Sequence, residues 1–154
     1  MVKAKSINIQ TVSWQDYALS LREIRTQVFI VEQHVTEEFE WDALDEIAIH
    51  LLAMVGNQPI ACARIIGNKI GRMAVIKTSR GKGFGMALIQ KALEIIKNNG
   101  QKGNGKSSAH LSAQTHAIGF YQRAGFVVTS EEYCDVDIPH VDMEYNFESS
   151  EPLR

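Results

Sequence analysis

A glycine-rich run near the middle of the chain has the composition of an anion-binding loop: Arg80-Gly81-Lys82-Gly83-Phe84-Gly85. The apolar run 70–75 precedes it, and a run with the apolar spacing of a helix follows from Met86 to Ile96. A glycine-rich turn that opens a helix exposes backbone N–H groups at the positive end of the helix dipole, where phosphate binds. The pattern therefore favours a phosphate-binding loop over a flexible surface turn.

The two common nucleotide-binding loops do not fit this run. A Walker loop requires Gly-Lys-Ser/Thr at the helix entry, whereas Gly85 is followed by Met86 and Ala87. The dinucleotide-binding fingerprint requires Gly-x-Gly-x-x-Gly, whereas these glycines are spaced Gly-x-Gly-x-Gly. A domain that binds a phosphate ligand of either of these kinds is therefore disfavoured.

Length and composition indicate a single globular domain. The chain has 154 residues, of which 45% are hydrophobic and 22% charged, and its formal net charge is −2. That charge gives no support to a nucleic-acid-binding protein, which usually has a strong basic excess. Cys62 and Cys134 lack metal-ligand spacing, and neither a signal peptide nor an apolar run of membrane-spanning length is found. We expect a cytoplasmic protein with no membrane or nucleic-acid partner.

Charge is distributed unevenly along the chain. No Lys or Arg lies between Arg25 and Arg64, and this gap contains Glu32, Glu37, Glu38, Glu40, Asp42, Asp45 and Glu46. Residues 69–106 are the opposite, because they are rich in Lys and Arg and carry Glu94 as their one acidic side chain. This asymmetry suggests two ligands of opposite charge, and a solvated acidic loop is the alternative.

Periodicity predicts an alternation of strands and helices. The expected strands are 7–11, 47–55, 60–66, 69–75, 108–113, 126–128 and 141–147, and the expected helices are 14–31, 86–96 and 115–124, with a further short helix within 32–46. Turn residues at 56–59 and 67–68 make the second to fourth strands an antiparallel meander. The second long helix ends at Asn98-Asn99-Gly100, before a loop through Gly103-Asn104-Gly105.

The element order and two motifs resemble those of the GCN5-related N-acetyltransferases (GNAT). The family motif Arg/Gln-x-x-Gly-x-Gly/Ala is matched by Arg80, Gly83 and Gly85. A second motif, Asn-x-x-Ala-x-x-Leu-Tyr-x-x-x-Gly-Phe, is matched at Ala117, Tyr121, Gly125 and Phe126, with Gln114 in place of Asn and Phe120 in place of Leu. The segments 25–33 and 138–143, with Asp42, Asp45, His50 and Ala113-Gln114, are similar to the ElaA-type branch of the family.

The resemblance implies an α/β (α+β) fold with a mixed central sheet of about six or seven strands flanked by helices, in the order β-α-(α)-β-β-β-α-β-α-β-β. We expect one such domain at residues 1–148 and a frayed tail at 149–154.

The resemblance also implies an acyl-CoA-dependent N-acyltransferase that uses acetyl-CoA as cosubstrate and acetylates a small-molecule or peptidyl amine. The CoA-binding loop would comprise Arg80, Gly81, Lys82, Gly83, Phe84, Gly85 and Met86, with the pyrophosphate on the N–H groups from Lys82 to Met86. The pantetheine arm would pair with Met73, Ala74 and Val75. Gln114 and Tyr121 complete the expected cofactor-binding set. A backbone N–H on the 73–75 strand would also stabilise the oxyanion.

Catalysis by such an enzyme needs a base for the amine and an acid for the leaving thiolate. Tyr121 is the expected acid, and the candidate bases are Glu32, Asp45, His50 and His140, of which we favour Glu32 and His140. His50 lies in an apolar run, so a core histidine is its alternative role. His110 and His116 have no third ligand at metal-binding spacing, so no metal is expected.

The acidic stretch favours a cationic amine as acceptor. A catalytically inactive CoA-binding sensor or interaction module is the alternative function, and a homodimer is left open.

Overall fold

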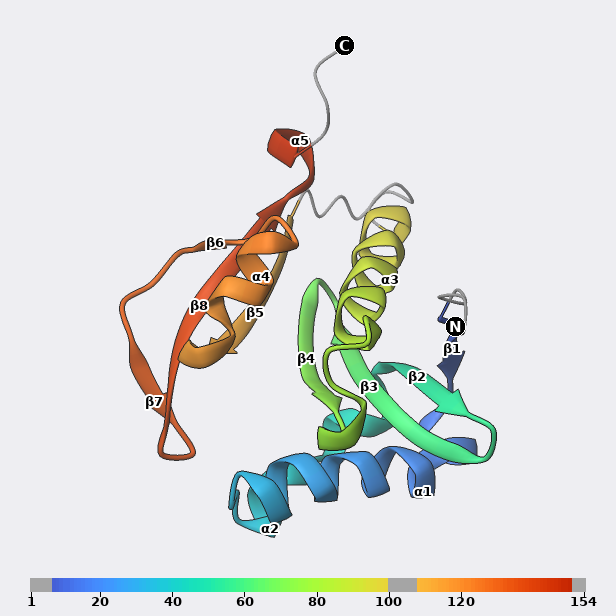
Figure 1. Ribbon diagram of the computed structural model, residues 1–154. Coiled ribbons are helices and arrows are strands. Elements are labelled where there is room, and N and C mark those ends of the chain that lie inside the picture. The colour runs from blue at the N-terminus through green and yellow to red at the C-terminus, as the bar shows by residue number, and fades with distance from the viewer. Residues whose placement is uncertain (1–6, 100–107, 151–154) are drawn as a thin grey trace. The chain divides into compact units, whose positions relative to one another are not determined.

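The computed structural model describes residues 7–99 and 108–150 of the chain (Figure 1). The chain divides into two compact units. The first runs to Arg64 and resumes over Arg72–Lys91, and the second comprises Ile65–Gly71 and the chain from Ala92 onward.

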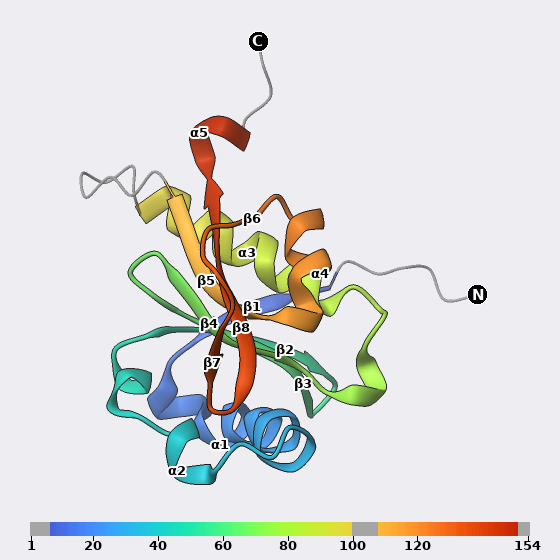
Figure 2. The ribbon, with the colours of Figure 1, turned by 90° about the vertical axis from the view of Figure 1, so that its left-hand side faces the viewer.

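Helices lie on both sides of the first four strands of the chain, most of whose residues belong to the first unit (Figures 1 and 2). α1 runs along one side of β2, β3 and β4, and the N-terminal part of α3 lies on the other. The elements are β1 (Ile9–Val12), α1 (Trp14–Arg25), η1 (Thr26–Glu32), α2 (Glu37–Glu40), η2 (Ala43–Glu46), β2 (Ile49–Val55), β3 (Gln58–Ile66), β4 (Lys69–Val75), η3 (Lys77–Ser79) and α3 (Phe84–Asn99).

The strands of this unit pair in chain order, β1-β2-β3-β4. β1 is antiparallel to β2, with Ile9 opposite Ala53 and Val12 opposite His50. The turns after β2 and β3 are two residues long and each begins with a glycine, Gly56 or Gly67, in the left-handed region. Because a two-residue connection joins only antiparallel strands, the predicted meander is confirmed.

The first helix differs from its prediction. Ser13 caps α1 by accepting the N–H of Asp16, and Leu21 and Ile24 are buried. After Arg25 the chain continues as the π-helix η1, in which the N–H of Gln33 donates to Val28 O at 3.1 Å. Apolar spacing over so few residues does not distinguish the wider π turn from an α turn. The single α-helix expected over 14–31 is therefore two helices of different kinds.

The acidic stretch after η1 contains two short helices, α2 and η2. Asp42 starts η2, because its carboxylate accepts the N–H of Leu44 at 3.1 Å. The stretch is thus more ordered than the irregular segment with one short helix that we expected.

The helix expected at 86–96 follows its prediction closely. α3 buries Leu88, Ile89, Ala92 and Ile96, which recur at the spacing of one helix face. The helix reaches Asn99, and Gly100 and the loop predicted at 103–105 lie outside the described residues.

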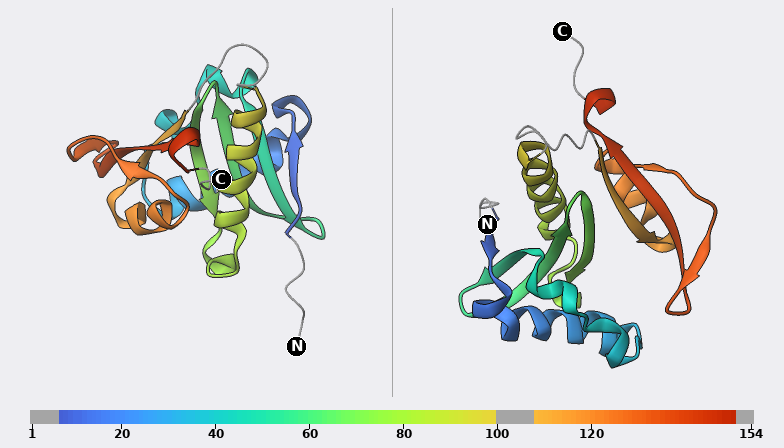
Figure 3. Two further views of the ribbon diagram at one scale, coloured as in Figure 1. Left: turned by 90° about the horizontal axis from the view of Figure 1, so that it is seen from above. Right: turned by 180° about the vertical axis from the view of Figure 1, so that it is seen from behind.

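A two-stranded antiparallel ladder, β5 with β8, forms the centre of the second unit, and α4 lies against it (Figure 3). β5 pairs along its whole length with β8, from Ser108 opposite Asn146 to Gln114 opposite His140, and is parallel to the start of β4 at Lys69 and Ile70. The elements after α3 are β5 (Ser108–Gln114), η5 (Thr115–Ala117), α4 (Ile118–Arg123), β6 (Val127–Val128), β7 (Tyr133–Asp135), β8 (Ile138–Asn146) and α5 (Phe147–Ser150).

Two strands of this unit differ from their prediction. β7 was not predicted, and β8 begins at Ile138 rather than at residue 141. β7 forms a hairpin with the first residues of β8, and Val136 and Asp137 at its turn both have positive φ. Such turns normally carry Asn-Gly or Asp-Gly, so the sequence gives no hairpin signal here. The tail expected at 149–154 starts within α5, and residues 151–154 lie outside the described residues.

The mixed α+β fold is confirmed. Eight strands are found within residues 7–99 and 108–150, one or two more than expected, because of β7. No helix in the described residues is long and apolar enough to cross a membrane. The single domain at 1–148 stays a prediction.

Candidate functional site

The glycine-rich run connects η3 to α3. Gly81 and Gly83 have φ values of +77° and +94°, which glycine adopts without steric cost. The N–H of Ala87 donates to Gly83 O at 3.1 Å, so the N–H groups of Phe84, Gly85 and Met86 precede the helical ladder. Donors of this kind at the positive end of a 16-residue helix suit an anionic group.

Arg80 joins this loop to the end of η1. Its Nε donates to Val75 O at 3.0 Å, and its Nη1 and Nη2 donate to the two carboxylate oxygens of Glu32 at 2.6 Å each. The Arg80 and Glu32 side chains are 41% and 33% exposed, and the hydrogen bond with Glu32 raises the pKa of Arg80. The candidate base Glu32 therefore lies beside the predicted phosphate loop and is hydrogen-bonded to Arg80, the first residue of that loop.

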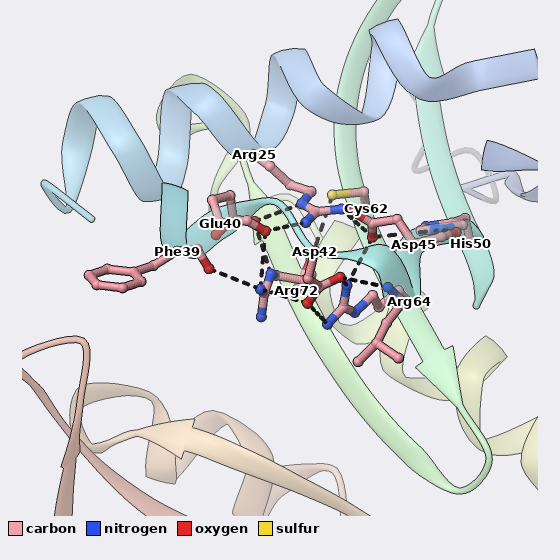
Figure 4. Close-up of polar contacts among 10 residues, drawn as sticks. Arg25, Phe39, Glu40, Asp42, Asp45, His50, Cys62, Arg64 and Arg72 are labelled. Carbon is pink, nitrogen blue, oxygen red and sulfur yellow. Dashed lines mark hydrogen bonds and ion pairs between the residues drawn. The ribbon is translucent and has the colours of Figure 1, made fainter. Parts of the chain in front are cut away.

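A second group of ion pairs, here called the arginine network, is mostly buried in the same unit (Figure 4). Its members are three arginines and three carboxylates that come from α1, the acidic stretch, β3 and β4: Arg25, Arg64, Arg72, Glu40, Asp42 and Asp45.

Arg25 is the most buried member, with 1% of its side chain exposed. Its Nε donates to Glu40 Oε2 at 2.7 Å, its Nη1 to Asp45 Oδ1 at 2.8 Å and its Nη2 to Glu40 O at 2.9 Å. The rings of Trp14 and Trp41 lie 5.6 and 5.0 Å from its guanidinium carbon. Arg25 thus ties α2 and η2 to α1.

Arg64 and His50 occupy the other end of the network. Arg64 Nη1 donates to Asp42 Oδ1 at 2.8 Å and to Asp45 Oδ1 at 2.9 Å, and Nη2 donates to Asp42 Oδ2 at 2.9 Å. The hydrogen bond from Arg64 lowers the pKa of Asp42. His50 Nε2 donates to the backbone oxygen of Asp45 at 2.8 Å, and burial lowers the pKa of His50. His50 is therefore a neutral core histidine, and Asp45 is a buried, ion-paired carboxylate.

The network changes the interpretation of the acidic stretch. Three arginines face three carboxylates within it, and Glu32 is paired with Arg80, so four of the seven carboxylates counted from the sequence face arginine. The remaining three, Glu37, Glu38 and Glu46, are exposed. The stretch is therefore neither a solvated loop nor a uniformly acidic surface.

Tyr121 lies on α4 in the second unit. It is 9% exposed, and its ring meets those of Phe120 and Phe126 edge-on, with centroids 5.1 and 5.9 Å away. Burial raises the pKa of Tyr121 to about 12, so its phenol stays protonated at neutral pH. Tyr121 is therefore a core residue, and its phenol is a weak proton donor because of its high pKa.

Gln114 and His140 are brought together, because they face each other in the β5–β8 ladder. Gln114 Oε1 lies 2.7 Å from His116 Nε2. His140 is 7% exposed, and its Nδ1 donates to Ile138 O at 2.7 Å, which leaves Nε2 with the lone pair in the neutral ring. The ring stacks on Tyr133 with centroids 6.1 Å apart.

A polar cluster beside His140 was not predicted. The hydroxyl of Tyr133 donates to Asp142 Oδ1 at 2.5 Å and is also bonded to Ser112 Oγ. These residues come from β5, β7 and β8, and only the strand register brings them together. No spacing in the sequence indicates the cluster.

The sequence profile of the "Acetyltransferase (GNAT) domain" matches residues 10–147. The chain belongs to the GNAT acetyltransferase family. Membership places it among the acyl-CoA-dependent N-acyltransferases, as the motifs predicted. The 114–126 motif and the 80–85 loop therefore lie in the second and first units of a GNAT domain, respectively.

Similar GNAT proteins and structures agree with the predicted branch. The uncharacterized protein YyaT of Bacillus subtilis is 38% identical over 142 residues, which are 88% of this chain and 93% of YyaT. ElaA of Escherichia coli is 30% identical over 149 residues, 86% of this chain and 95% of ElaA. A crystal structure of an acyl-CoA N-acyltransferase from Pseudomonas aeruginosa superimposes with a TM-score of 0.78 at 30% identity, covering 90% of this chain and 99% of that one. The resemblance to the ElaA-type branch is confirmed.

The functional roles of the individual residues stay predictions. Within residues 7–99 and 108–150, no three His, Cys, Asp or Glu side chains form a group that could hold a metal.

Proposed function

We propose that this protein transfers an acetyl group from acetyl-CoA to an amine by direct attack in a ternary complex. The observation that carries the proposal is the loop 80–86, whose N–H groups at the start of α3 and flanking Arg80 and Lys82 suit the CoA pyrophosphate. Met73, Ala74 and Val75 would pair with the pantetheine arm, and Gln114 and Tyr121 would complete the CoA-binding set.

Attack requires a neutral amine. A lysine-like amine has a pKa of about 10.4, so its deprotonation near pH 7.4 costs about 4 kcal/mol. Glu32 and His140 are the proposed bases. Glu32 would act once phosphate has replaced it at Arg80, and His140 would accept the proton at Nε2, because its Nδ1 carries a proton for Ile138 O.

Collapse of the tetrahedral intermediate expels the CoA thiolate, which Tyr121 would protonate. A free thiol has a pKa near 8.5, whereas that of Tyr121 is about 12, so full transfer to a free thiolate is uphill by about 5 kcal/mol. The proton transfer must therefore accompany C–S cleavage rather than follow it. We expect Tyr121→Phe to lower kcat about 10- to 1,000-fold, with little change in the KM for acetyl-CoA; full activity in this variant would assign the proton to another group.

The acceptor is proposed to be cationic. Since the arginine network is charge-balanced and Glu32 is paired, the attraction for a cation would come from Glu37, Glu38 and Glu46, which are exposed. Polyamines, amino sugars and lysine-like amines are the chemical class that this predicts. The cytoplasm, where acetyl-CoA is made and used, is the proposed location.

A panel of amines incubated with acetyl-CoA, with release of free thiol as the readout, tests this function. We expect turnover with at least one cationic amine and less with aspartate- or glutamate-like amines. Longer acyl-CoA donors in the same panel test the acetyl assignment. Specific acetyl-CoA binding without turnover on any amine would instead favour the inactive sensor or interaction module.

A further inference from the structure

β4 contains a backbone distortion at Arg72. Its φ is +48°, the left-handed region, which a side chain with a Cβ adopts only at a cost in free energy. The other non-glycine residues with positive φ among the described residues, His34, Val136 and Asp137, lie between regular elements. Arg72 is the one that lies inside a strand, so its surroundings must hold it in place.

The backbone carbonyl of Arg72 is held by a thiol. Cys62 Sγ on the neighbouring strand β3 donates to Arg72 O at 3.6 Å. Cys62 is fully buried, and burial raises the pKa of its thiol to about 12, so the donor keeps its proton. Because the C=O and N–H of a trans peptide point in opposite directions, the N–H of Met73 points away from Cys62 Sγ.

The guanidinium of Arg72 is held by the end of α2 (Figure 4). Its Nη2 donates to Glu40 O at 3.1 Å and to Phe39 O at 3.4 Å, and its Nε lies 3.0 Å from Glu40 Oε2. The last carbonyls of a helix lack intrahelical donors, so Arg72 satisfies groups that α2 leaves open. Asp42 Oδ2 lies 3.4 Å from the same Nη2.

Arg72 differs from the other two arginines of the network in its exposure, its backbone conformation and its position in the chain. Its side chain is 26% exposed, against 1% for Arg25 and 8% for Arg64, so it contributes less to the buried core. Its own backbone is strained, and it directly precedes the strand residues 73–75.

We propose that Arg72 is a positioning residue that fixes the direction of the Met73 N–H. Its guanidinium, clamped between Phe39 O, Glu40 and Asp42, keeps the left-handed backbone that aims this N–H at the thioester carbonyl of the acyl donor. The inference rests on the proposed function, in which the strand 73–75 holds the pantetheine and its N–H group stabilises the oxyanion. It adds a residue from outside the two GNAT motifs to the machinery of acyl transfer.

The test compares Arg72→Ala with Arg72→Gly. Both variants lose the guanidinium, but glycine adopts a φ of +48° without strain, whereas alanine does not. A positioning role predicts that kcat falls about 100-fold in Arg72→Ala, that the KM for acetyl-CoA changes less than about threefold, and that Arg72→Gly recovers part of the loss. Equal losses in the two variants, or an unchanged kcat in Arg72→Ala, would overturn the proposal.

Two further variants separate positioning from folding. Arg72→Lys keeps the charge without the bidentate reach and is expected to fold with an intermediate kcat. Arg64→Lys disturbs the same network through Asp42 and Asp45, and its kcat is expected to match that of the unaltered protein. A loss in Arg64→Lys equal to that in Arg72→Lys would show a general effect of the network and contradict the proposal.

A second readout is independent of turnover. The ¹H–¹⁵N cross-peak of the Met73 amide is expected to move strongly in Arg72→Ala and less in Arg72→Gly. If the protein acylates no amine, the proposed function fails, and this signal still decides the role of Arg72. An unmoved Met73 amide in Arg72→Ala would refute the inference even in an active enzyme.

Discussion

Two arginine–carboxylate sites in the first unit have nearly the same bond lengths and opposite surroundings. Arg80 meets Glu32 at 2.6 Å with side chains 41% and 33% exposed, whereas Arg25 meets Glu40 at 2.7 Å with side chains 1% and 4% exposed. An exposed pair is worth about 0–1 kcal/mol and can exchange its partner. A buried pair cannot exchange, because either ion left alone would be uncompensated. Burial, and not distance, therefore separates a pair whose arginine can exchange its partner for a ligand from a pair that is structural.

The largest effect is expected at the buried site. Arg25→Met leaves Glu40 and Asp45 buried with fewer partners and should lower the free energy of unfolding by about 3–5 kcal/mol, measured by urea denaturation. Arg22→Met is the matched control. Arg22 lies on the same helix and over the same Trp14 and Trp41 rings, at 5.4 and 5.3 Å, but is exposed.

The control variant should lose only about 0.5–1 kcal/mol, the usual value of an exposed cation–π contact. Equal losses in the two variants would show that the arginine network adds no stability beyond the tryptophan contacts.

The two cysteines extend the comparison to pH. Cys62 is buried and Cys134 exposed. The pKa of Cys62 rises from 9.0 to about 12 on folding, so the unfolded chain loses this proton first and the stability falls as pH rises between these values. By pH 10.5 the loss from this thiol is about 2 kcal/mol.

Chemical denaturation at pH 8 and pH 10.5 measures this loss. Cys62→Ala should show a smaller decrease in stability over this interval than the unaltered protein, and Cys134→Ala should not. At pH 8 a thiol reagent should modify Cys134 in the native protein and both thiols in urea. Rapid modification of Cys62 in the native protein would contradict the burial of the thiol that donates to Arg72 O.

The smallest effect on stability is expected at the exposed site. Glu32→Gln should change the free energy of unfolding by less than about 1 kcal/mol. Because it removes a carboxylate that competes with phosphate for Arg80, it should leave acetyl-CoA affinity unchanged or raise it, while lowering turnover. Glu38→Gln, which removes an exposed charge of the same stretch, is the control and should lower turnover less. A weaker acetyl-CoA affinity in Glu32→Gln would contradict the exchange of partners at Arg80.

Much of the fold could be predicted because it depends on local patterns. The spacing of Leu88, Ile89, Ala92 and Ile96 defines α3, and the glycine turns define the meander. η1 was predicted as part of an α-helix, because seven residues do not separate a π turn from an α turn. β7 was missed because its turn, Val136-Asp137, carries neither glycine nor asparagine.

The sequence indicates candidate site residues mainly where a motif is contiguous, and their roles stay predictions. The loop 80–85 and the residues around Tyr121 are such motifs. The arginine network and the Arg80–Glu32 pair join residues 15 to 48 positions apart in the chain. The sequence shows the segment without Lys or Arg between Arg25 and Arg64. The arginines that pair with its carboxylates lie at the two ends of that segment and beyond it. Composition therefore suggested an acidic surface where folding makes a neutral core.

Titration calorimetry on the unaltered protein and on Gly85→Val measures whether acetyl-CoA binds to the loop 80–86. Gly85 lies in α3 without a positive φ, so valine obstructs the ligand's approach without straining the loop as it would at Gly83. We expect specific binding of acetyl-CoA, with a stabilisation of about 2.7 kcal/mol at 100 times the Kd, and its loss in folded Gly85→Val. Unchanged affinity in that variant, or no binding to the unaltered protein, would contradict the account.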